Sequence, residues 1–483
     1  MTTPPDSYHN SSDSIARKNN ESIKESILHH DKMQPSSTII FSMSNAMIGP
    51  TILLLPLNIV NIGLLTSVVV AIVICLISWR TCQLTHLHSK LDEVEYIPAI
   101  KRTMGKGWMY LYFAHSLVTL WMAAIIYFLS LSDVTYSCLK LMFNAKDWPS
   151  EDTFTLERFS YQYTGIILMS LIGGLFFLKK LGRILDLTEK GIYSILVEGA
   201  FALYLGAKAV ASGTVKLVFY SENLEYPREE LGLMSSESLI YTIGVFAMAF
   251  CVHNAVVAIV RKNKVQTENY NCVSKAYTIT FVTYVITGSL GAIGLYQKIT
   301  PGANTILNNS LYDRDDTLTF ILLVITQLMT AFQLVTVLPV INNVVKTQFF
   351  IIIYGENGVP PKAAYIAFNV VFIVSLLTVQ LLNISPNAVM SYSGAFIGFV
   401  IIYLLPIGIH VKTLKLRQQH ETQNYLALTE GTKPSELQLE KIADFIQDKQ
   451  KISYSMEYFV HGGIMAVGVS IFIIQFISLF QGE

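Results

Sequence analysis

Eleven apolar stretches, each long enough to cross a lipid bilayer as a helix, constrain this chain more than any other feature. The hydrocarbon core of a membrane is about 30 Å thick, which a helix of roughly 20 residues spans. Backbone N–H and C=O groups find no water there, so a spanning segment is a helix or part of a closed barrel. Hydrophobic residues make up 52% of the 483 residues and charged ones 14%, which indicates an all-α polytopic membrane protein. The predicted spans are 39–60, 62–84, 109–140, 161–178, 190–212, 239–260, 276–296, 318–345, 363–382, 388–411 and 457–480.

Positive charge falls mainly on one side of these spans. With the N-terminus in the cytosol, the cytosolic segments hold 26 Lys and Arg residues and the opposite face holds eight. Short loops rich in Lys and Arg stay in the cytosol. We therefore expect a cytosolic N-terminus and, because the number of spans is odd, a lumenal C-terminus. The formal net charge is zero, so nothing indicates a nucleic-acid partner.

Outside the spans, few residues are available to form a folded unit. The N-terminal tail is polar and Ser-rich, and we expect it to be disordered in the cytosol. In the linker before the last span, Ser435 and Gln438 form a capping box that predicts an amphipathic helix. The expected organisation is a tail at 1–36, a core at 37–412 with spans 1–5 at about 39–212 and spans 6–10 at about 239–411, a cytosolic linker at 413–456, and the last span with the C-terminus at 457–483.

The first and the sixth span carry groups that interrupt a membrane helix. In the first, Asn45 is followed by Gly49-Pro50-Thr51, which weakens the helix. In the sixth, Phe250 is followed by His253 and Asn254, which place polar atoms at membrane depth. Non-helical backbone at that depth is tolerated only where it is buried in protein or lines a cavity. Broken helices at corresponding positions of two halves indicate the binding site of a secondary transporter.

The spacing of the two interruptions predicts an inverted repeat. Five spans separate them, and a repeat unit with an odd number of spans returns upside down in the membrane. We therefore expect a 5+5 inverted repeat, with both breaks near mid-membrane and the eleventh helix peripheral. No catalytic serine triad, metal cluster or phosphate loop appears in the sequence, so we expect neither an enzyme nor an organic cofactor.

Three polar side chains near the breaks have two interpretations each. Asn45 either binds a cation and lines the gap, where helix ends suit a carboxylate and an ammonium, or joins two helices. Thr336 either adds a hydroxyl to a hard cation or bonds to its own helix. His253 is either a substrate ligand or pH sensor, or a hydrogen-bonded core residue.

A buried acid and a glycosylation sequon are two further candidate functional features. Glu198 is the only acid well inside the membrane and away from either end of its span. It is either a coupling or gating group, or a protonated acid bonded to a neighbouring helix. Asn308-Asn309-Ser310 is a glycosylation sequon in the predicted lumenal loop 297–317, with Asn308 as the acceptor.

Several motifs resemble the amino acid/auxin permease family, and within it the sodium-coupled neutral amino acid transporter group. They are Ser44-Asn45-Ala46-Met47-Ile48-Gly49, the stretch Ala249-Phe250-Cys251-Val252-His253-Asn254, the stretch Leu334-Val335-Thr336-Val337-Leu338-Pro339, and Tyr392-Ser393-Gly394-Ala395. The resemblance covers about residues 39–480, and it is greatest to a lysosomal, arginine-sensing member of the group.

The resemblance implies the inverted-repeat fold of the amino acid–polyamine–cation superfamily and Na⁺-linked movement of amino acids. It implies that Asn45 and Thr336 are sodium ligands and that the residues from Asn45 to Pro50 line the amino acid site. With their neighbours at the two breaks, the candidate substrate-binding residues are Asn45, Ala46, Met47, Ile48, Gly49, Pro50, Thr51, Phe250 and His253.

Together these features predict a secondary active transporter of neutral or cationic amino acids, coupled to Na⁺ and working by alternating access. The expected location is a lysosomal, endosomal or vacuolar membrane, with the plasma membrane left open. The alternative is an amino acid receptor that signals to cytosolic nutrient-sensing machinery with little flux. In that alternative the tail at 1–36 would hold a Rag–Ragulator-like partner.

Overall fold

A computed structural model describes the chain from residue 33 to residue 481. Within this range it does not describe residues 92, 94, 146–147, 150–157, 179–189, 221–229, 235–238, 300–304, 314, 355–359 and 431–452. Most of the predicted tail and the predicted amphipathic helix after Ser435 lie outside the described residues.

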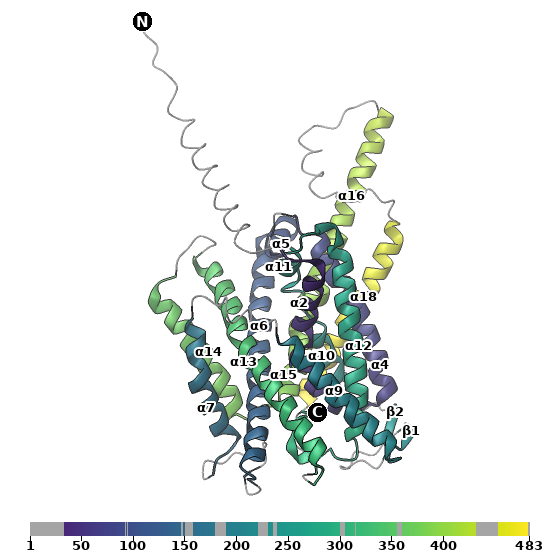
Figure 1. Cartoon of the computed structure of the whole chain (residues 1–483). Coiled ribbons are helices and arrows are strands. Elements are labelled where there is room, and N and C mark those ends of the chain that lie inside the picture. The colour runs from purple at the N-terminus through teal and green to yellow at the C-terminus, as the bar shows by residue number, and fades with distance from the viewer. Residues whose placement is uncertain are drawn as a thin grey trace.

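The described residues form a bundle of long helices (Figure 1). In the first half of the chain these are α2 (Ser36–Ile48), α3 (Thr51–Ile62), α4 (Leu64–Leu87), α5 (Ile97–Met104), α6 (Lys106–Met142), α7 (Tyr161–Ile172), the 3-10 helix η1 (Gly173–Phe177) and α9 (Ile192–Ala211). In the second half they are α10 (Leu239–Ala249), α11 (Val256–Val260), η2 (Gln266–Glu268), α12 (Asn269–Leu295), η3 (Asn309–Leu311), α13 (Thr317–Tyr354), α14 (Lys362–Leu381), α15 (Pro386–Tyr392), η4 (Ser393–Ile397), η5 (Phe399–Leu404), α16 (Leu405–Glu430) and α18 (Tyr454–Gln481).

The helices confirm a polytopic membrane architecture. Within the described residues, eight helices are long and apolar enough to cross a membrane, or nine when the bent pair α2–α3 is one span. Two shorter apolar helices, Tyr161–Phe177 and Leu239–Ala249, coincide with the predicted fourth and sixth spans. Every predicted span thus contains an apolar helix, while the count of eleven crossings stays a prediction.

A small sheet interrupts the predicted all-α pattern. Strands β1 (Leu217–Tyr220) and β2 (Leu231–Met234) pair in parallel between α9 and α10, at the lower end of the bundle in Figure 1. β2 packs against the turn between α3 and α4, where Gly63 has a φ of 87°. A Cβ on residue 63 would lie 2.7 Å from the carbonyl oxygen of Leu233, so this close approach requires glycine.

α12 is the helix around which the broken first span is organised. It packs against α2, α3, α4 and α9, whereas α13 packs chiefly against α6. α12 therefore contacts both pieces of the first span.

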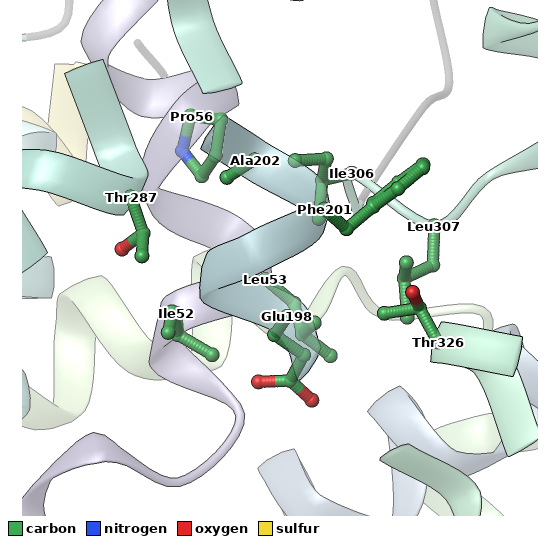
Figure 2. Close-up of a pocket in the computed structure, with 10 residues that line it drawn as sticks. All are labelled: Ile52, Leu53, Pro56, Glu198, Phe201, Ala202, Thr287, Ile306, Leu307 and Thr326. Carbon is green, nitrogen blue, oxygen red and sulfur yellow. The ribbon is translucent and has the colours of Figure 1, made fainter. Parts of the chain in front are cut away.

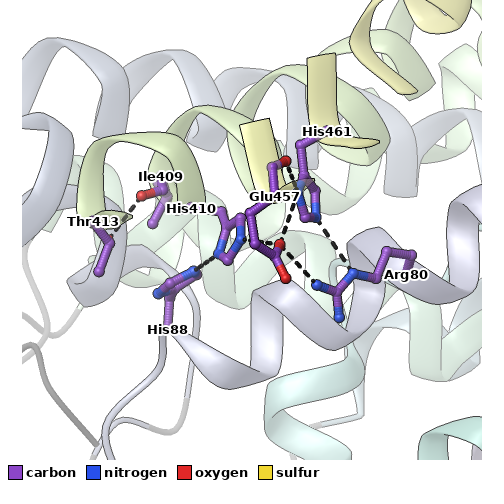
Figure 3. A network of polar contacts seen from close by, with 7 residues as sticks. All are labelled: Arg80, His88, Ile409, His410, Thr413, Glu457 and His461. Carbon is purple, nitrogen blue, oxygen red and sulfur yellow. Dashed lines mark hydrogen bonds and ion pairs between the residues drawn. The ribbon is translucent and has the colours of Figure 1, made fainter. Parts of the chain in front are cut away.

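A polar network joins α18 to α4 and α16 (Figure 3). The Glu457 carboxylate accepts from Arg80 Nη2 at 3.3 Å and lies 3.1 Å from both His410 Nε2 and His461 Nδ1. His88 Nε2, just beyond the end of α4, lies 3.0 Å from His410 Nδ1. Burial, with the nearby positive groups as a second cause, lowers the pKa of His88 to about 3, so this imidazole is neutral at physiological pH.

The same network contains the described residues that come nearest to a metal-binding set. His410, Glu457 and His461 place their ligand atoms within 4.8 Å of one another. Arg80, however, already supplies the positive charge that Glu457 requires and also donates to His461 Nε2 at 3.3 Å. We therefore interpret the network as the polar attachment of a largely lipid-exposed helix.

The tenth predicted span departs from a regular α-helix. α15 is followed by the π-helical turns η4 and η5 before α16 begins. Gly394 in η4 faces Gly244 in α10 so closely that a Cβ on residue 394 would overlap the Gly244 carbonyl oxygen. Small residues allow two membrane helices to pack backbone to backbone.

Replacing Gly394 with alanine is expected to destabilise the bundle. The added methyl would collide with backbone, which cannot rotate away, and overpacking of this kind costs about 1–3 kcal/mol. Thermal unfolding of the purified protein in detergent should show a lower Tm for Gly394→Ala. Gly463→Ala on α18 is the matched control, because a Cβ there has no atom within 4 Å. Equal melting temperatures for the two variants would contradict the proposed close packing.

Candidate functional site

The first predicted interruption is confirmed. α2 ends at Ile48 and α3 begins at Thr51, and the two axes differ in direction by 53°. Gly49 forms the bend with a φ of 34°. A Cβ on residue 49 would lie 2.5 Å from the Tyr127 hydroxyl of α6, so both the conformation and the space require glycine.

The second predicted interruption is also present. α10 ends at Ala249 and α11 begins at Val256, which leaves residues 250–255 outside regular helix. Phe250 is fully buried in this gap. The two broken spans thus each release backbone groups from helical hydrogen bonding.

Two tyrosines of α12 bring the breaks together. The Tyr284 hydroxyl donates to the Met47 carbonyl at 2.6 Å and lies 3.3 Å from the carbonyl oxygens of both Ile48 and Ala249. Two turns earlier, the Tyr277 hydroxyl donates to the Phe250 carbonyl at 2.9 Å. A hydroxyl has a single proton, so the three carbonyls around Tyr284 share one donor. The ends of α2 and α10 therefore converge on one point beside α12.

Gln333 of α13 lies next to both predicted sodium ligands. Its Nε2 is 3.4 Å from Asn45 Oδ1, and its backbone carbonyl accepts from the Thr336 hydroxyl at 2.9 Å. The Thr336 hydroxyl is thus bonded to its own helix in this conformation. Gln333 is 2% exposed. The sequence prediction did not include this residue, although a glutamine within an apolar span is itself an indication of a functional position.

The predicted substrate residues of the first span divide into two groups. Asn45 is half-buried and Ala46 is exposed. The others, Met47, Ile48, Gly49, Pro50 and Thr51, are buried. Asn45 and Ala46 are therefore the accessible members of this stretch.

His253 and Phe250 face other helices. His253 is 1% exposed, and its Nε2 lies 2.9 Å from the Thr81 hydroxyl of α4. The Phe250 ring packs edge-on against Tyr284, with 5.4 Å between the ring centroids. In this conformation His253 has the contacts of a hydrogen-bonded core residue, and Phe250 supports the tyrosine that joins the breaks.

Glu198 and Asn308 are both buried. Glu198 on α9 lines a small cavity beside α3 (Figure 2), and its carboxylate accepts from the Thr330 hydroxyl of α13. Asn308 is 1% exposed, and its Oδ1 accepts from the Ser310 backbone N–H at 3.0 Å. The glycosylation of Asn308 stays a prediction.

Comparison with known families gives a match over most of the chain. The profile of the transmembrane amino acid transporter protein family matches residues 36–429. This range includes both breaks, α12 and α13.

Individual relatives agree with this match. The chain is 24% identical over 430 residues to neutral amino acid transporter 9 of Danio rerio, covering 79% of this chain and 76% of that protein. It is 27% identical over 171 residues to the sodium-coupled neutral amino acid transporter 9 homolog of Caenorhabditis elegans, covering 35% of this chain and 26% of that protein.

Among solved structures, the crystal structure of MhsT in complex with L-phenylalanine has a similar fold. The TM-score is 0.52 and the sequence identity 11%, over 90% of this chain and all of that one. The likeness supports the inverted-repeat transporter fold that the spacing of the two breaks predicts.

The Tyr284 hydroxyl is expected to stabilise the paired breaks. In Tyr284→Phe, the carbonyls of Met47, Ile48 and Ala249 lose their shared donor where no water replaces it, which costs about 1–3 kcal/mol. The measurement is thermal unfolding in detergent. Tyr270→Phe, at an exposed position of the same helix, is the control and should leave the Tm unchanged. An unchanged Tm for Tyr284→Phe would contradict the assigned role.

Proposed function

The chain belongs to the transmembrane amino acid transporter family, and from that premise we propose that it is a secondary active transporter of neutral or cationic amino acids. In this proposal transport is coupled to Na⁺ and proceeds by alternating access across an endolysosomal membrane. The observation that carries the proposal is the convergence of the two broken spans on the Tyr284 hydroxyl.

The helix ends at the breaks have the polarity that an amino acid requires. α3 begins at Thr51 without a side-chain cap, and a helix N-terminus attracts a carboxylate. The last carbonyls of α2 and α10 attract an ammonium group. In this structure they share the Tyr284 hydroxyl as their hydrogen-bond donor. A bound α-amino acid would place its two charges between these ends, next to Asn45 and Ala46.

The proposed sodium site lies between α2 and α13. The amide oxygen of Asn45 and the hydroxyl of Thr336 are hard oxygen ligands. The Gln333 side chain donates to Asn45, and Thr336 lies one turn after Gln333 on α13, where its hydroxyl donates to the Gln333 backbone carbonyl. The printed name of the Caenorhabditis elegans relative, a sodium-coupled transporter homolog, supports Na⁺ as the coupling ion. A cation here would join the first and eighth predicted spans.

The proposed membrane and orientation have separate support. The resemblance of the sequence motifs to a lysosomal member of the sodium-coupled neutral amino acid transporter group supports an endolysosomal membrane. The Lys and Arg distribution supports a cytosolic N-terminus and a lumenal C-terminus. In Figure 1, α2 begins at the upper end of the bundle and α18 ends toward the lower end, which agrees with that topology.

Loss of the Asn45 amide is expected to weaken the Na⁺ dependence of transport. The purified protein would be placed in proteoliposomes and the uptake of radiolabelled arginine, leucine and glutamine measured with and without a Na⁺ gradient. Asn45→Ala and Thr336→Val should each weaken apparent Na⁺ affinity about tenfold or more, equivalent to about 1.4 kcal/mol.

Two variants control for the loss of an amide or a hydroxyl elsewhere in the membrane. Asn343→Ala lies on α13, and Thr378→Val lies on α14, where the hydroxyl, like that of Thr336, donates to a backbone carbonyl of its own helix. Both should transport like the wild type. Uptake that ignores Na⁺ in the wild type would contradict sodium coupling. Binding without flux under any gradient would favour the receptor alternative.

A further inference from the structure

Glu198 occupies a site separate from the two breaks. It lies on α9, is 5% exposed, and faces α3 and α13 (Figure 2). Oε1 accepts from the Thr330 hydroxyl of α13 and from the Ser194 hydroxyl, at 3.2 Å, one turn earlier on α9. Oε2 is inaccessible and finds no hydrogen-bond partner among the described residues. Oε1 thus receives two hydroxyl donors, while Oε2 has no hydrogen-bond partner among the described residues.

The space beside Glu198 cannot hydrate a charge. Its volume is about 10 Å³, at the lower limit for a single water molecule. Two hydroxyls line it, and each bonds within its own helix: Thr287 donates to Thr283 and Thr326 donates to Leu322. The remaining lining is apolar: Ile52, Leu53 and Pro56 from α3, Phe201 and Ala202 from α9, and Ile306 and Leu307 from the loop before η3.

The described residues offer Glu198 no positive partner. Lys208, on the same helix, pairs with Asp316. Lys346 of α13 bonds to the Phe176 carbonyl at 3.2 Å and to the Tyr365 hydroxyl at 2.9 Å. Lys275 of α12 is exposed at the other end of that helix. An ionised carboxylate at this depth would therefore have no countercharge, which costs several kcal/mol.

The other titratable neighbours add no positive charge. α3 carries no ionisable side chain. From α6, the Tyr127 phenol is the titratable group that Glu198 influences electrostatically, and Asp133 of the same helix accepts from Thr305 at 2.8 Å. A neutral carboxylic acid fits these surroundings: its carbonyl oxygen, Oε1, receives two hydroxyl donors, and Oε2 carries the proton.

We propose that Glu198 is a proton-binding site that links amino acid transport to proton movement. In the packing described here the carboxyl holds its proton. When α3 moves away from α9, water enters and the O–H bond of the carboxyl breaks, leaving the carboxylate and a hydrated proton. The inference rests on the proposed transport function, because α3 is the piece of the broken first span that closes the site.

The site is connected to the proposed sodium site through α13. Thr330, which donates to Glu198, lies three residues before Gln333, which contacts Asn45. Residues three apart share one face of a helix. A displacement of α13 that follows cation or substrate binding would therefore also move the hydroxyl donor of Glu198.

The first test measures the proton directly and needs no transport. Infrared spectra of the purified protein at neutral pH should contain a carboxylic acid C=O band that is missing in Glu198→Gln. Glu230→Gln, at an exposed position before β2, is the matched control and should retain the band. Identical spectra for the wild type and Glu198→Gln would overturn the proposal, whatever the protein transports.

The second test measures coupling in proteoliposomes with equal Na⁺ on both sides. Wild-type uptake should respond to a pH gradient and change the lumenal pH reported by a trapped dye. Glu198→Gln should retain exchange of labelled for unlabelled amino acid, within about twofold, and lose at least tenfold of the pH-driven accumulation. Transport that follows Na⁺ and ignores pH in both proteins would overturn the proton site and leave the proposed function intact. Absence of uptake and exchange in the wild type would overturn both.

A second variant, Thr330→Val, tests the proposal if Glu198→Gln does not fold. The Thr330 hydroxyl bonds to both forms of the carboxyl but more strongly to the charged one, so in Thr330→Val the pH of half-maximal uptake should move upward relative to the wild type. A folded Thr330→Val protein with an unmoved pH profile would overturn the proposal.

Discussion

The arrangement of this protein depends on how backbone carbonyls are satisfied where two membrane helices break. In lipid, an unpaired peptide group costs several kcal/mol, and two interrupted spans expose several of them near one another. α12 supplies hydrogen-bond donors to the freed carbonyls of both spans through two tyrosine hydroxyls that lie two turns apart. Because Tyr284 serves α2 and α10 together, neither break can be moved without changing the donor of the other.

Close approach is the second constraint, and glycine makes it possible. At Gly49 a left-handed φ and the Tyr127 hydroxyl together exclude any side chain. At Gly244 and Gly394 the backbones of α10 and η4 meet, so the second broken span is fixed to the irregular tenth one. The breaks therefore sit between elements that touch backbone to backbone, and small shifts at the breaks pass directly to these neighbours.

Much of the helical architecture was readable from the sequence, because hydrophobic length and the cost of unpaired backbone leave a membrane segment few alternatives. The break at Gly49-Pro50 could be predicted for the same reason. The side chains that hydrogen-bond to the freed carbonyls at the breaks could not be predicted. Tyr284 and Tyr277 have no special spacing in the sequence, and their role follows only from the packing of α12 against α2. Gln333 was missed beside Thr336, and the contact of His253 with Thr81 required the placement of α4. Long-range side-chain partners depend on how helices pack, which periodicity does not encode.

The short stretch of α13 from Thr330 to Thr336 connects the proposed proton site to the proposed sodium site. Thr330 donates to Glu198, Gln333 approaches Asn45, and Thr336 bonds to Gln333. These residues span less than two turns, so they move as one rigid piece of helix. A cation near Asn45 and Thr336 would favour one position of this piece, and a protonated Glu198 would favour the position in which Thr330 reaches it. If the two positions are the same, the ions bind cooperatively, and if they differ, each ion weakens the binding of the other by the same factor. The sign of that coupling would then decide whether the proton travels with the sodium ion or against it.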